Sequence, residues 1–197
     1  MLPRPCLLLL ALSWSSASAQ SDSAADRKLV GDYRPQASFD TSTKARSIVF
    51  EVARDTGGHH AEIRSACFLP SGGNASGSIE TATITKRVQA SDTLYVLSLG
   101  YTGVQRLVPR GGIQFSADST IVQLVEPSDE HPRDAQPGST VKEAWNYRID
   151  RAKIRQLAKA KVLIARVQGS EGRCDMAFQP GTQARLRQFI QHELPAS

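Results

Sequence analysis

Residues 145–192 read WNYRIDRAKIRQLAKAKVLIARVQGSEGRCDMAFQPGTQARLRQFIQH and show the clearest pattern in the chain. Alternating apolar residues predict a strand that ends at Ile149. Asp150 follows, and its carboxylate is suited to cap a helix that begins at Arg151 and ends near Ala160. The rest of the run predicts a hairpin, over residues 161–168 and 173–179, and a second helix over residues 182–192.

Period-two alternation continues upstream and predicts further strands. Their ranges are 47–53, 61–69, 78–88, 94–101, 113–115 and 121–125. The first two of these strands, separated by a turn at Asp55–Gly58, are predicted to form a hairpin, and so are the last two. Altogether about nine strands and two late helices are expected. This order is typical of an α+β domain: a largely antiparallel sheet, curved or divided into two packed sheets, with two short helices near the C-terminus.

Residues 1–19 predict a signal peptide. Arg4 supplies a positive start, residues 7–12 an apolar core, and Ala17-Ser18-Ala19 a cleavage site that leaves Gln20 as the new N-terminus. The apolar core is too short to span a membrane, which takes about 20 residues. We therefore expect a protein exported to the periplasm or the extracellular space, with no transmembrane anchor in the mature chain.

The mature chain of about 178 residues is long enough for one domain with its own core. Residues 20–44 are polar, rich in Ser, Ala and Asp, and lack an apolar period, so a flexible N-terminal segment is predicted there. A single α+β domain is expected over residues 45–197. The pattern gives no indication of an oligomeric state.

Two cysteines, Cys67 and Cys174, follow the signal peptide, each on the apolar face of a predicted strand. In an oxidising compartment, paired thiols become disulfides. A bridge between them is expected, and it would tie the first half of the domain to its last hairpin. The alternative is two separate buried thiols that pack as small apolar side chains.

Basic residues are concentrated in the C-terminal part of the chain. Between Arg148 and Arg187 there are ten basic and three acidic residues, whereas the rest of the mature chain has a net charge of −3. Arg151, Arg155 and Lys159 recur every four residues and therefore line one side of the first predicted helix. Such an asymmetry favours an anionic partner for this end of the protein, or a contact between its own two halves.

Both predicted helices also carry cations near their N-termini, where the helix dipole disfavours exposed positive charge by about 0.3–1 kcal/mol each. One explanation is an anion held there by backbone amides and basic side chains together. The candidate anion- or partner-binding residues are Arg151, Lys153, Arg155, Lys159, Arg185 and Arg187. The alternative is a basic face that only solvates the protein.

The sequence contains no motif of known catalytic chemistry, and no cofactor is expected. His59 and His60 are weak candidates for a metal site, because neighbours on a strand point to opposite faces. His131, in a charged loop over residues 126–139, is equally weak. No two carboxylates fall on one helix face where they could act as an acid–base pair.

These features predict a non-enzymatic binding module that works in the cell envelope or outside the cell, and an inhibitor or immunity-type protein is one subclass that fits. Its expected partner is an envelope protein, an anionic polymer or a lipid head group. Nucleic acid is not expected, because the protein is predicted to be exported and its aromatic residues fall in strands, which leaves no stacking platform. The alternative function is that of a hydrolase or metal-dependent enzyme whose site is assembled from distant strands and loops.

Overall fold

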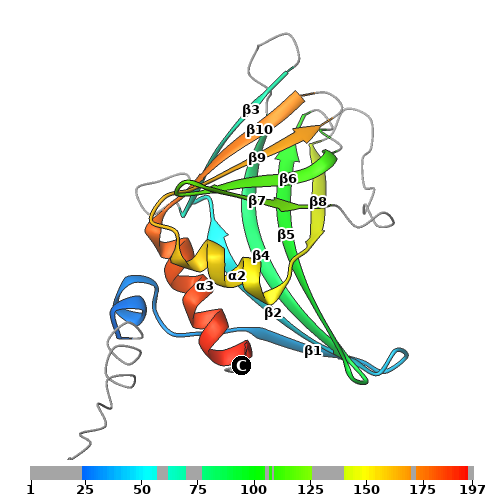
Figure 1. Ribbon diagram of the computed structural model, residues 1–197. Coiled ribbons are helices and arrows are strands. Elements are labelled where there is room, and N and C mark those ends of the chain that lie inside the picture. The colour runs from blue at the N-terminus through cyan, green and yellow to red at the C-terminus, as the bar shows by residue number, and fades with distance from the viewer. Residues whose placement is uncertain are drawn as a thin grey trace, which may run out of the picture.

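The computed structural model describes residues 24–56, 62–69, 77–104, 107, 109–125, 140–169 and 172–194. Within them, ten strands form two antiparallel sheets of five strands each (Figure 1). The first sheet contains, in spatial order, β1 (Gln36–Asp40), β2 (Ala45–Arg54), β4 (Gly77–Gln89), β5 (Asp92–Gly103) and β8 (Val141–Arg148). The second contains β3 (Ile63–Phe68), β10 (Gly172–Phe178), β9 (Leu163–Gly169), β6 (Pro109–Ala117) and β7 (Thr120–Leu124).

Two helices lie late in the chain, α2 (Arg151–Lys159) and α3 (Pro180–Glu193), and residues 24–30 form a further short helix. The predicted α+β class is confirmed, in the version with two sheets. Its strands number ten among the described residues because β1 belongs to the first sheet. Both late helices occur where the sequence predicted them, and Asp150 caps the first.

The core lies between the two sheets. On β9 and β10 every second residue is buried, and on β8 Trp145 and Tyr147 are fully buried. The Trp145 ring stacks on Tyr101 of β5 with 5.1 Å between ring centres. Phe115 and Phe178 meet across the second sheet at 6.0 Å. This interior contains an apolar void of only about 10 Å³, which is too small for a ligand.

Two of the three predicted hairpins are confirmed and one is wrong. The β6–β7 and β9–β10 hairpins pair as predicted. By contrast, β2 pairs with β1 and β4, whereas β3 pairs with β10 in the other sheet. The chain changes sheets between them, and the amide of Glu62 donates to the carbonyl of Arg54 at 3.0 Å near this crossing. A short connection predicts that two strands pair, but here the strands that it joins belong to different sheets.

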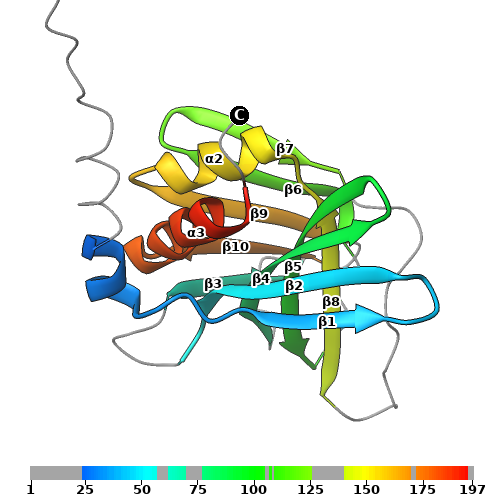
Figure 2. The same ribbon diagram turned by 90° about the horizontal axis from the view of Figure 1, so that it is seen from below.

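The two late helices lie side by side over one end of the sheets, as Figures 1 and 2 show. Ile154 and Leu157 of α2, with Leu186 and Phe189 of α3, are buried in the same core cluster as the strands. Burial of each of these side chains contributes about 1.5–3 kcal/mol, so packing holds both helices in place.

Within the segment predicted to be flexible, residues 24–30 form a short helix and residues 36–40 form strand β1, and the flexibility expected of residues 20–44 stays a prediction. The short helix packs beside α3 (Figure 2), and Asp26 within it is only 4% exposed. Residues Gln36–Asp40 pair with β2 as an edge strand. The segment has no apolar period because ion pairs and hydrogen bonds to distant residues hold it, and such contacts leave no local pattern.

Cys67 and Cys174 form the expected disulfide, at directly opposed positions of β3 and β10. The bond joins residues 107 positions apart, so it fixes a long-range pairing between the early and late parts of the chain. In the described parts of the chain, no helix combines the length and the apolar character needed to cross a membrane.

Candidate functional site: a basic helix and a pocket beside α3

α2 is fixed at its start and along one side. The Asp150 carboxylate accepts a hydrogen bond from the Lys153 backbone amide at 2.8 Å and so caps the helix. Ile154, Leu157 and Ala158 are buried. Because the helix cannot turn about its axis without exposing these three side chains, its opposite side stays toward solvent.

Three cations occupy successive turns of α2. Arg151 and Lys159 are exposed and Arg155 is half-buried. A rise of about 1.5 Å per residue places consecutive members about 6 Å apart along the axis. The Arg151 guanidinium also lies 5.7 Å from the centre of the Tyr95 ring, a cation–π arrangement that limits its freedom.

Lys153 and Lys161 add positive charge to this region, the first within α2 and the second just beyond its end. The Lys153 ammonium lies 3.7 Å from the Asp150 carboxylate, which partly neutralises it. Lys161 is exposed just beyond the helix, and the backbone amides of Lys161 and Val162 donate to the Asp118 carboxylate at 3.1 and 2.9 Å. These two hydrogen bonds lower the pKa of Asp118, and the bond from Val162 has the larger effect. The turn between β6 and β7 therefore holds the corner that follows α2.

Arg185 and Arg187 of α3 make internal ion pairs. Arg187 donates from Nε to Asp26 at 2.8 Å and from Nη1 to the Ala158 carbonyl at 3.1 Å. Arg185 donates from Nε to Glu62 at 3.0 Å. The first turn of α3 contains no acidic residue. Carboxylates from distant parts of the chain instead pair with Arg185 and Arg187 and offset their positive charge. The six candidates fall into two groups, four on α2 and two in ion pairs of α3, and an anion-binding role for any of them remains a prediction.

The segment before β1 is also fastened to the far end of α3. The Tyr33 ring stacks on His192 with 4.4 Å between ring centres, and its hydroxyl donates to Glu193 at 3.2 Å. The Lys86 ammonium donates to the same carboxylate at 3.2 Å. Burial, followed by the charge of Glu193, raises the pKa of Tyr33. This end of α3 is therefore engaged in structural contacts.

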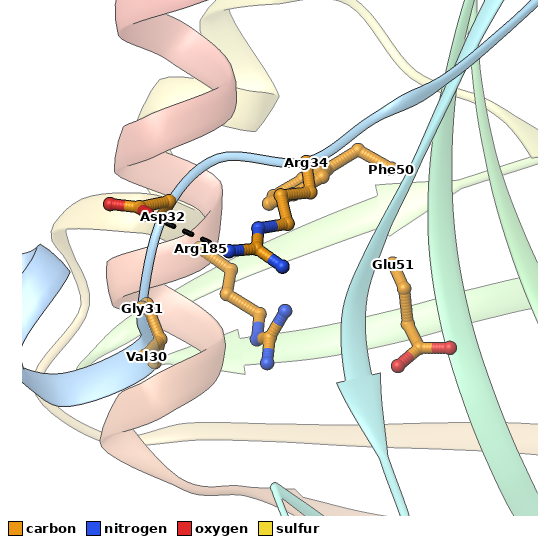
Figure 3. Close-up of a pocket in the computed structure, with 7 residues that line it drawn as sticks. All are labelled: Val30, Gly31, Asp32, Arg34, Phe50, Glu51 and Arg185. Carbon is orange, nitrogen blue, oxygen red and sulfur yellow. Dashed lines mark ion pairs between the residues drawn. The ribbon is translucent and has the colours of Figure 1, made fainter.

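A pocket of about 520 Å³ lies between the N-terminal segment, β2 and α3. Its lining residues are Val30, Gly31, Asp32, Arg34, Phe50, Glu51 and Arg185 (Figure 3). The view in Figure 3 shows the guanidinium groups of Arg34 and Arg185 directed into this space, with Glu51 across from them on β2. The Gln188 side chain donates from Nε2 to the carbonyl of Gly31 at 2.7 Å, which keeps the segment against α3.

Arg185 was predicted as an anion-binding candidate, but this pocket was not predicted. Its walls come from positions around 30–34, 50–51 and 185, which no motif connects. A signal was present only in hindsight: three charged residues, Asp32, Arg34 and Glu51, lie beside apolar neighbours in an otherwise polar stretch and the strand that follows it.

The weak metal candidates are not placed by the structure. His59, His60 and His131 lie outside the described residues. Among the residues that are described, no group of three or more His, Cys, Asp or Glu side chains is arranged to hold a metal ion.

Comparisons of the chain with protein-family models, with curated proteins and with solved structures found no match.

Proposed function

We propose that this chain is an exported, non-enzymatic binding module that holds an anionic macromolecular surface through the exposed side of α2. The observation that carries the proposal is the row of Arg151, Arg155 and Lys159 on a helix whose other side is buried in the core. The helix beneath the row is fixed by its cap and its buried side, so little backbone freedom is lost when the row meets a repeating array of negative groups.

Export is supported by two features. The predicted signal peptide directs the chain out of the cytoplasm. The disulfide between Cys67 and Cys174 suits an oxidising compartment, where such bonds form and persist. In the cell envelope, phosphate and carboxylate groups on lipids and polymers offer the anionic chemistry that Arg and Lys bind.

The strength expected of such a contact is moderate. Near an anionic surface each Lys or Arg contributes about 1 kcal/mol, so three cations give about 3 kcal/mol, or roughly a 100-fold effect on affinity. Salt reduces it, because the screening length falls from about 30 Å at 0.01 M to about 3 Å at 1 M ionic strength. Lys161, just beyond the helix, is positioned to add to the row.

The test is a binding assay with two anionic probes, vesicles that contain phosphatidylglycerol and soluble polyphosphate, beside neutral phosphatidylcholine vesicles. The triple variant Arg151→Gln, Arg155→Gln, Lys159→Gln is expected to bind at least one anionic probe roughly 100-fold more weakly at low salt. Loss on vesicles alone points to lipid head groups, and loss on polyphosphate alone points to a polymer.

The matched control removes three exposed cations elsewhere, through Arg64→Gln, Arg110→Gln and Lys142→Gln on β3, β6 and β8. It has the same net charge as the triple variant and is expected to bind about as well as the unaltered protein. Equal losses in both variants would show that only net charge matters, and no binding to either anionic probe at low salt would refute the proposal.

A further inference from the structure

We infer that the pocket between the N-terminal segment and α3 binds a small zwitterion, an amino acid or a short peptide, with its carboxylate on Arg34 and Arg185 and its amino group toward Glu51 and Asp32. This would be a second site, separate from the basic side of α2. Its volume of about 520 Å³ lies within the range of about 300–1,000 Å³ that is usual for small-ligand sites.

Arg185 provides the strongest argument for a bound carboxylate. Its side chain is only 25% exposed, and Nε donates to Glu62 at 3.0 Å. A guanidinium carries five N–H donors, yet the described residues supply an acceptor to Nε alone. Among the described residues, the Nη groups of this largely buried cation on the pocket wall are left without an acceptor, which a ligand in the pocket can supply. A carboxylate, with two oxygens in a plane, is the group that such a fork binds best.

Arg34 offers a second guanidinium, from the N-terminal segment. Its side chain is 86% exposed, and its contact with Asp32 is an ion pair of 3.8 Å, longer than a hydrogen bond. It is thus able to move toward a ligand at small cost. The positive charges of Arg34 and Arg185 in the pocket repel each other, and an anion bound between them offsets that repulsion.

The acidic residues of the pocket decide between classes of anion. Asp32 and Glu51 balance the formal charges of Arg34 and Arg185, so the lining is neutral as a whole. Such a lining disfavours phosphates and other polyanions. It favours a ligand that carries one negative and one positive group, although Glu51 already shares its carboxylate with Arg54.

The apolar part of the wall would contact the body of the ligand. Val30 and Gly31 contribute it from the N-terminal segment, and Phe50 from β2. The Phe50 ring is held by Tyr33, with 4.5 Å between ring centres. Because one guanidinium belongs to the segment and the other to α3, a ligand that bridges them would also fasten the segment more tightly.

The test is an NMR titration of the purified protein with the dipeptide Ala-Leu. Two altered forms follow: its C-terminal amide, which has no carboxylate, and its N-acetyl form, which has no amino group. Binding of Ala-Leu with a Kd on the order of 1 mM or tighter is expected, with shifted amide signals at Val30, Gly31 and Phe50. The amide is expected to bind at least about tenfold more weakly, and the acetyl form several-fold more weakly. L-Leucine distinguishes a site for free amino acids from one that needs a peptide.

The variant Arg34→Gln is expected to weaken Ala-Leu binding about tenfold, whereas the control Arg46→Gln, an exposed cation of β2 outside the pocket, leaves it unchanged. Arg185→Gln also breaks the ion pair with Glu62, so its melting temperature is measured beside its affinity. The inference is overturned if neither Ala-Leu nor L-leucine shifts the pocket signals at about 10 mM. It is also overturned if the amide or acetyl form binds as tightly as Ala-Leu, or if Arg34→Gln binds normally.

Discussion

In α3, Arg185 and Arg187 donate to Glu62 and Asp26, whereas in α2 Arg151 and Lys159 lie exposed on the side away from the core. Both helices lack acidic residues in their first turns, and they pack against each other. The difference comes from carboxylates 123 and 161 positions away in the sequence, which reach α3 but not the exposed side of α2. Similar charge on two neighbouring helices therefore serves internal cohesion in α3, whereas in α2 Arg151 and Lys159 face solvent.

The disulfide strengthens the attachment of α3, because it ties β10, the strand directly before that helix, to β3. Replacing both Cys67 and Cys174 by Ala is expected to reduce the free energy of unfolding by about 4–5 kcal/mol in the chain-entropy model. The melting temperature would then fall by roughly 10–20 °C, measured by circular dichroism. Equal melting of the unaltered protein with and without a reducing agent would contradict this account.

Asp26 is the partner whose loss should loosen α3 most directly. Asp26→Ala leaves Arg187 without its carboxylate, and a destabilisation of about 1–3 kcal/mol is expected, less than for a fully buried pair because the Arg187 side chain is 38% exposed. Hydrogen exchange over residues 24–33 should become faster. The control Asp32→Ala removes an exposed carboxylate with only a 3.8 Å contact and is expected to change stability by less than about 0.5 kcal/mol. A similar loss in both variants would mean that the buried pair has no special role.

Asp118 supports the corner after α2 and gives a pH-dependent test. It has a positive φ of 53°, which Asn tolerates better than Ala, so Asp118→Ala should destabilise more than Asp118→Asn. Hydrogen bonds from Val162 and Lys161 lower its folded-state pKa. The stability that the ionised Asp118 carboxylate contributes is therefore present above a pH of about 4. It is lost as the pH falls through the lowered folded-state pKa. Denaturant unfolding at several pH values should show the gap between Asp118→Asn and the unaltered protein narrowing in acid; a constant gap would show that the charge is unimportant.

The smallest effect on stability is expected from the cations of α2. The double variant Arg151→Gln, Lys159→Gln, which changes only the two exposed cations, should unfold within about 0.5 kcal/mol of the unaltered protein. Relief of unfavourable charge in the first turn offsets loss of the contact between Arg151 and Tyr95. A loss above about 1 kcal/mol would place these cations in the same structural role as those of α3.

Much of the local structure could be predicted from the sequence. Asp150, the buried stripe of Ile154, Leu157 and Ala158, and the β6–β7 and β9–β10 hairpins all lie within short ranges of the chain. The opposed cysteines were also predictable, because each occupied the apolar face of a strand. The hairpin expected around residue 57 was wrong, since spacing does not reveal whether a short connection continues one sheet or crosses to another.

The candidate sites divide in the same way. The row of Arg151, Arg155 and Lys159 is visible in the sequence, because its spacing equals about one helical turn. The ion pairs of Arg185 and Arg187, and the pocket beside Arg34, depend on contacts between residues far apart in the sequence. Local periodicity states which side of each element is apolar, and this determined the strands, the helices and the basic side of α2. Which residues far apart in the chain meet, pair and enclose a pocket was decided only when the two sheets packed, because ion pairs and pocket walls require proximity in space and leave no period in the sequence.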